Sequence, residues 1–186
     1  RYEINAAGEI KASESMTADK NRKDVTILFR FGMSFALPPV YNVVDFYGKG
    51  PYENYADRKS SAMVGLYRQS VDEQYHTGYV RPQESGTHSD LRWWRITDLS
   101  GRGFEIVSDG LFSASALPYD MADIDRGTPF SVNHPNELKK RKATHVNFEL
   151  KQMGIGGIDS WNEIPLDDYL IPYNDYTFNF IIRPLK

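Results

Sequence analysis

Alternation of apolar and polar residues with a period of two dominates the chain. From Val25 to Leu37 every odd position is apolar, over thirteen residues. A β-strand with one buried face produces this pattern, and no helical period fits it. At about 3.3 Å per residue such a strand would be roughly 40 Å long, which indicates a large sheet. Similar alternation recurs in residues 91–97, 144–150 and 176–183.

Turn signals separate these runs. Residues 5–8, 100–103 and 108–110 combine Gly with Asn, Ser or Asp, and the last of these predicts a hairpin that joins 104–107 to 111–117. Only residues 60–67 and 121–125 are expected as short helices. Several strands, tight turns and almost no helix predict an all-β antiparallel sandwich, formed as a single domain over residues 1–186. In the strand at 91–97, Trp93 and Trp94 should face opposite sides, so at most one of them belongs to a given core layer.

Three long segments rich in Gly, Pro and polar residues, 47–58, 78–90 and 154–165, are the candidate sites, because binding residues are often placed on loops of a rigid scaffold. The segment from Gly154 to Trp161 contains three glycines in four residues and ends on Asp159, Ser160 and Trp161. Trp161 could plug the end of the sandwich. Alternatively, the loop presents its indole as a flat platform for a sugar, with Asp159 and Ser160 beside it for the hydroxyl groups.

The other two segments indicate loops that polar contacts hold in place. The Gly-x-Gly-Pro sequence that ends at Pro51 allows an abrupt change of chain direction. Asp57 and Arg58 are adjacent, so they cannot pair well with each other and each must find a partner elsewhere. The polar residues of 79–90 run directly into the Trp93 strand, which favours a buried polar network that fixes the shape of the loop.

Composition excludes several functions. The chain carries 22 basic and 25 acidic side chains, a net charge of −3, so we expect no nucleic-acid partner. The basic run at 139–142 is interpreted as a solvated turn. The chain contains no cysteine, and no apolar run approaches the ~20 residues of a membrane span. The four histidines lack the spacing of a zinc site, there is no Gly-x-Ser-x-Gly motif, and the carboxylates form no recognisable catalytic pair.

Four stretches together resemble one family. They are YGKGPYENYADR at 47–58, RPQESG at 81–86, DLRW at 90–93 and QMGIGGIDSW at 152–161. Residues 134–138 and 176–184 fit as well. In this order and spacing they are similar to the C-terminal domain (domain 5, the small chain) of bacterial β-galactosidases of glycoside hydrolase family 2. The resemblance covers the chain from about Tyr2 to its end.

The resemblance implies a galactose-mutarotase-like supersandwich, of which this chain would be the later, N-terminally truncated part. It implies that the parent enzyme hydrolyses terminal, lactose-like β-D-galactosides with retention, using glutamates of a TIM barrel. No residue of this chain would then be catalytic, and the chain alone should be inactive. Mg²⁺ and Na⁺ would be bound in other domains. By resemblance, Trp161 contacts substrate, and the loop that contains Gly50, Glu53 and Asn54 borders the pocket.

Two alternatives stay open. A mutarotase-like aldose epimerase would need a histidine acid and a carboxylate base that converge on one sheet face. A carbohydrate-binding or purely structural module would bind a sugar or hold subunits together without turnover. Because early strands would be missing from the sheet, we also expect the chain to self-associate through an uncovered edge or apolar face. The sequence leaves both the cytosol and the periplasm open as compartments.

Overall fold

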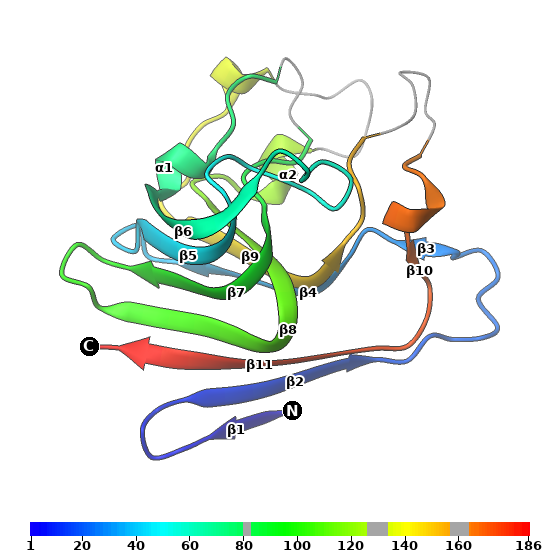
Figure 1. Cartoon of the computed structure of the whole chain (residues 1–186), viewed down its shortest axis with the longest axis horizontal. Coiled ribbons are helices and arrows are strands. Elements are labelled where there is room, and N and C mark those ends of the chain that lie inside the picture. The colour runs from blue at the N-terminus through cyan, green and yellow to red at the C-terminus, as the bar shows by residue number, and fades with distance from the viewer. Residues whose placement is uncertain (80–82, 126–133, 157–163) are drawn as a thin grey trace.

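The computed structural model describes residues 1–79, 83–125, 134–156 and 164–186. Strands are the predominant secondary structure, and every strand pair is antiparallel (Figure 1). The strands are β1 (Tyr2–Ile4), β2 (Ile10–Met16), β3 (Ile27–Leu28), β4 (Arg30–Leu37), β5 (Val43–Gly50), β6 (Met63–Ser70), β7 (His88–Thr97), β8 (Gly103–Leu117), β9 (Thr144–Gln152), β10 (Ile171–Pro172) and β11 (Tyr176–Leu185). The helices are single turns: α1 (Val71–Gln74), α2 (Met121–Ile124), η1 (Pro135–Glu137) and η2 (Asp167–Tyr169). The predicted all-β antiparallel class is confirmed.

The long strand β8 connects two parts of one sheet. The main path runs β1-β2-β11-β8-β7-β5-β6, and β9 and β4 branch from it. The first part of β8, up to Ser108, pairs with β11, whereas Ser113–Leu117 pairs with β9. The branch folds back over the main path, because Phe148 of β9 packs edge-on against Phe180 of β11 with ring centroids 4.8 Å apart. The result is a sandwich with its core between the two parts.

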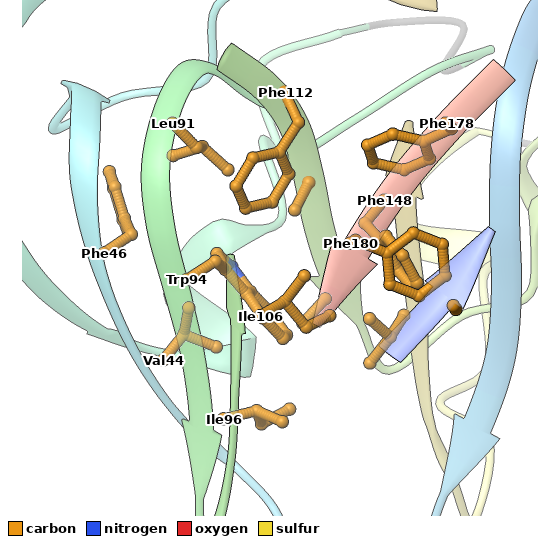
Figure 2. Packing of buried hydrophobic residues seen from close by; sticks show 14 of the residues in the cluster. Val44, Phe46, Leu91, Trp94, Ile96, Ile106, Phe112, Phe148, Phe178 and Phe180 are labelled. Atoms are coloured by element: carbon orange, nitrogen blue, oxygen red, sulfur yellow. The ribbon is translucent and has the colours of Figure 1, made fainter. Parts of the chain in front are cut away.

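Apolar side chains from both parts fill this core (Figure 2). Trp94, Phe46, Leu91 and Ile106 lie on the β5-β7-β8 side and are almost completely buried. Phe148, Phe178 and Phe180 meet on the other side, where their rings contact one another. Burial of large aromatic side chains dominates the stability of such a core. The predicted alternation is confirmed here, since Trp94 is buried and Trp93 lies on the opposite face beneath Arg95.

The turns at residues 5–8 and 100–103 are confirmed. Gly8 and Gly101 have φ of +82° and +88°, a conformation that glycine adopts without strain. The short helix expected at 121–125 is α2, which Asp120 caps. The basic run at 139–142 is exposed, with Lys140 paired to Asp72 at 2.7 Å, as expected of a solvated turn.

Three predicted elements were wrong. The strand expected over 25–37 is divided into β3 and β4, which pair with β10 and β9 respectively, and Phe29 between them is 74% exposed. The helix expected at 60–67 is mostly β6, because residues 63–70 pair with β5 along its whole length. The hairpin expected at 108–110 is part of the continuous strand β8. The register against β7 shifts there, so the extra residues form a bulge rather than a turn.

Among the described residues, no helix has the length and hydropathy needed to cross a membrane. The helices α1 and α2 lie at the same end of the sandwich, on the opposite side of the molecule from β1, β2 and β11 (Figure 1). The loop that follows β5 lies near this end and carries several of the candidate residues.

Candidate functional site

The loop after β5 begins at Gly50, which forms a cis peptide bond with Pro51. A Cβ atom at Gly50 would lie 2.8 Å from the ring of Tyr67, so a side chain cannot be placed there without a shift. The strand β5 ends at Gly50 and a bend follows at residues 51–52, as predicted for the Gly-x-Gly-Pro sequence, and Glu53 and Asn54 after it are buried.

Glu53 accepts hydrogen bonds at both carboxylate oxygens and is almost completely buried. Oε1 accepts from Arg58 Nη2 at 2.6 Å and from Tyr79 Oη at 2.5 Å. Oε2 accepts from Tyr55 Oη at 2.9 Å and from the Gly86 backbone N–H at 2.8 Å. Burial and the bond to Glu53 raise the pKa of Tyr79 to about 12, so its phenol is a donor at neutral pH. Four donors occupy this carboxylate, which fixes the loop.

Asn54 ties the same loop to β7 and has no exposed surface. Its amide nitrogen donates to the carbonyl oxygens of Lys49 and Tyr52, at 2.9 and 3.1 Å. Its Oδ1 accepts from the backbone N–H of Ser89 at 3.0 Å and from the Ser89 hydroxyl. The internal bonds of Glu53 and Asn54 match the prediction of a loop pinned by polar contacts. Whether Gly50, Glu53 and Asn54 also border a substrate pocket stays a prediction.

Asp57 joins this loop to the glycine-rich segment. Asp57 Oδ2 accepts from the backbone N–H of Gly156 at 2.7 Å, and Oδ1 accepts from that of Ile155 at 3.2 Å. A Cβ atom at Gly154 would lie only 2.7 Å from Asp57 Cγ, which explains a glycine at that position. Asp57 and Arg58 thus have separate partners, as predicted. Trp161, Asp159 and Ser160 lie outside the described residues, and the described segment ends at Gly156, five positions before Trp161.

An open pocket of about 580 Å³ lies beside this junction. Its lining includes the exposed ring of Phe29, the charged side chains of Arg30 and Glu84, and residues 152–155. Pockets that combine apolar walls with a few polar groups are the usual form of ligand sites. The glycine-rich segment therefore begins at the edge of a concave surface.

Sequence reasoning missed a buried charge cluster below this pocket. Arg30 Nη1 donates to Glu149 Oε1 at 2.6 Å, and Arg30 Nη2 donates to Glu84 Oε2. Complete burial raises the pKa of Glu149 to about 7, although Arg30 acts in the opposite direction. Burial also raises the pKa of Glu84. Within the described part of the chain, Oε2 of Glu149 is buried without a hydrogen-bond partner. The sequence offered no signal for it, because Glu149 occupies a polar position of the alternating run at 144–150.

The epimerase alternative requires a histidine acid near a carboxylate base, so the surroundings of the histidines matter for it. His88 is fully buried, and its ring nitrogens lie 3.1 Å from the carbonyl oxygens of Gly86 and Pro51. Burial lowers the pKa of His88, which favours a neutral ring that donates to one of these two carbonyl oxygens. His145 lies 3.4 Å from Asp120 and is partly exposed. In the described ranges, no three His, Asp or Glu side chains are placed so that they could hold a metal ion.

An antiparallel sandwich whose polar loops meet at one end belongs to the class of β-domains that present a site on loops. The chain belongs to the β-galactosidase small chain family, whose family model matches residues 1–182. It is 35% identical over 185 residues to a β-galactosidase of Priestia megaterium, covering 99% of this chain and 17% of that protein. It is 33% identical to a β-galactosidase of Halalkalibacterium halodurans, covering 98% of this chain and 18% of the relative. It is 34% identical to β-galactosidase BgaC of Bifidobacterium adolescentis, covering 92% of this chain and 16% of that protein. The chain spans less than a fifth of the length of these relatives.

Proposed function

We propose that this chain is a non-catalytic domain of a larger β-galactosidase of glycoside hydrolase family 2, where it completes the substrate site. The parent enzyme would hydrolyse terminal, lactose-like β-D-galactosides with retention, using two glutamates of a TIM barrel outside this chain. Any Mg²⁺ and Na⁺ would be held by other domains. The domain itself would have the supersandwich form of galactose mutarotase.

The observation that carries this proposal is the bond between Asp57 and the start of the glycine-rich segment. Two backbone N–H groups, of Ile155 and Gly156, donate to one carboxylate and hold the backbone at the last described residues of this segment. A flat ring that stacks on a sugar must be held in a defined orientation, because loss of its freedom on binding lowers affinity. Asp57 would provide that orientation for Trp161.

The roles of the candidate residues differ accordingly. Trp161 would stack on the sugar, and Asp159 and Ser160 would bond its hydroxyl groups. Glu53 and Asn54 would act as positioning residues, because their polar atoms are occupied inside the protein. Gly50 would allow the loop to turn beside the pocket. The domain thus supplies one wall of a site whose reacting groups lie elsewhere.

The test uses the full-length β-galactosidase that contains this chain. Trp161→Ala should lower kcat/KM by about tenfold or more, which corresponds to about 1.4 kcal/mol of transition-state stabilisation. Asp57→Asn should lower it in the same direction, because an amide offers one acceptor oxygen in place of two. Asp24→Asn is the matched control, since Asp24 pairs with Arg22 on the surface. Unchanged kinetics in both Trp161→Ala and Asp57→Asn would contradict the proposed role.

The isolated chain provides a second test. With a chromogenic β-galactoside it should show only the buffer rate. Turnover that disappears when a carboxylate of this chain is replaced would instead show that the chain is catalytic. Rapid interconversion of aldose anomers by the chain would support the epimerase alternative.

A further inference from the structure

A second cleft, of about 220 Å³, shares only Gln152 with the lining of the pocket described above. Its walls come from the loop at 56–59, from β7, β8 and β9, and from the segment 168–171. Its volume is below the range of ordinary drug-sized pockets, so it suits a small ligand. The proposed function does not use this cleft.

Asp90 has an uncommon backbone conformation. Its φ is +53°, and among the described residues it alone has a positive φ without being a glycine. It lies where the register between β7 and β8 shifts between His88 and Leu91. Bulges of this kind change the direction of a side chain and are frequent beside functional sites. Glycine would fit this conformation without strain, whereas aspartate places a carboxylate in the cleft wall.

The polar groups of the cleft retain unused bonding capacity. Lys59 Nζ donates to Asp90 Oδ1 at 2.8 Å, and both side chains are partly exposed. In the described part of the chain, the second carboxylate oxygen of Asp90 accepts no hydrogen bond, and Lys59 donates no other. The pair therefore offers donors and an acceptor side by side, which is what two neighbouring hydroxyl groups require.

The remaining lining indicates a neutral ligand with an apolar face. Two lysines and two aspartates line the cleft, so their charges balance. Ser113 and Gln152 add polar groups, while Leu111 and Tyr169 provide apolar surface. We propose that this cleft binds a monosaccharide-sized, neutral polyhydroxyl compound through Lys59 and Asp90, as a site separate from the one that contains Trp161.

The cleft also shares a wall with the glycine-rich segment. The carbonyl oxygen of Tyr169 accepts a hydrogen bond from the Gly154 backbone N–H at 2.9 Å. A ligand that contacts Tyr169 would thus lie one hydrogen bond away from the start of that segment. A Cβ atom at Gly154 would lie 2.7 Å from Asp57 Cγ and 3.0 Å from Tyr169 Cβ, so this glycine packs closely against both residues.

The experiment is a titration of the ¹⁵N-labelled chain with D-galactose and D-glucose, followed by amide chemical shifts. We expect saturable shifts at Ser89, Asp90, Ser113 and Gln152, with a Kd in the millimolar range. Asp90→Asn and Lys59→Met should each weaken binding at least fivefold, whereas Asp24→Asn, remote from the cleft, should not change it. Asp90→Gly should abolish binding but raise the melting temperature, because glycine relieves the positive φ.

Separate outcomes overturn the proposal. A folded spectrum that shows no cleft shifts at about 100 mM sugar, far above a millimolar Kd, would reject it. Equal shifts with glycerol or inorganic phosphate would show that the cleft does not select a sugar-like ligand. Shifts confined to residues 50–54 and 154–156 would assign sugar binding to the site of the proposed function and reject this one. Trp161→Ala should leave the cleft affinity unchanged, so failure of one proposal does not imply failure of the other.

Discussion

The buried pair of Arg30 and Glu149 predicts an unusual dependence of stability on pH. The pKa of Glu149 is raised from 4.5 to about 7 by complete burial. A carboxyl whose pKa is higher in the folded than in the unfolded state binds its proton more tightly when folded. Its contribution to stability is therefore fully present below pH 4.5 and is lost as the pH rises through 7. Since one pKa unit corresponds to about 1.4 kcal/mol, the loss is about 3 kcal/mol.

Glu149→Gln isolates this contribution, because the amide resembles the protonated carboxyl and does not titrate. At pH 5 the variant should be close to the wild type in its free energy of unfolding. At pH 8 it should be more stable by about 3 kcal/mol, which corresponds to a melting temperature higher by roughly 6–12 °C for a chain of this size. Burial also raises the pKa of Glu84. Glu84 therefore makes stability fall with rising pH in both the wild type and Glu149→Gln.

The assay is urea denaturation of the chain at half-unit intervals from pH 4.5 to 8.5, read by tryptophan fluorescence. Glu9→Gln serves as a control, because Glu9 forms an exposed ion pair with Arg183 that should contribute less than about 1 kcal/mol. The difference between Glu149→Gln and wild type should grow with pH. If Glu149→Gln were less stable than wild type at pH 8, attraction to Arg30 would exceed the cost of burying the charge, and the reasoning would be wrong.

Three further changes test the core, the loop and the sheet edge. Phe148→Ala should lower the free energy of unfolding by about 3–5 kcal/mol, whereas Phe29→Ala, at a 74% exposed ring, should change it by less than about 1 kcal/mol in the same urea titration. Glu53→Gln should cost about 2–4 kcal/mol, because the amide nitrogen would face donors that now bond a carboxylate; an unchanged melting temperature would contradict this. Leu66→Lys should reduce self-association in sedimentation experiments, because Leu66 is 71% exposed on β6, at one end of the main strand path. Leu99→Lys, in the turn before β8, should not reduce it, and a monomeric wild type would rule out association through this edge.

Local patterns predicted the strands whose two faces differ, and failed where pairing overrides a local signal. Alternation identified most of β4, β7, β9 and β11, and it placed Trp93 and Trp94 on opposite faces. At 108–110 the residues are typical of a turn, yet β7 pairs with β8 on both sides of them, so the strand continues. The local sequence at 60–67 predicts a helix, although β5 provides a partner along the whole of β6. No local feature of either segment reveals its partner strand.

The candidate site likewise contains some contacts that the sequence predicted and others that it did not. Adjacency alone predicted that Asp57 and Arg58 need separate partners, and both partners are present. The partner of Asp57 lies 99 residues away, however, and Arg30 and Glu149 are separated by 119 residues. Such distances are closed only by the folding of the whole sandwich. The buried cluster therefore could not be predicted from residue type or spacing.

The pairing of β2 with β11 has a consequence for biosynthesis. Ser15 on β2 meets Thr177 on β11, 162 residues later in the chain. At about 5–20 residues per second, the ribosome makes β11 roughly 8–30 s after β2. During that interval β2 has β1 on one edge but lacks β11, its partner on the other edge. The edge of β2 that pairs with β11 cannot form those hydrogen bonds until β11 emerges, and an unpaired strand edge of this kind is a natural target for chaperones while translation continues.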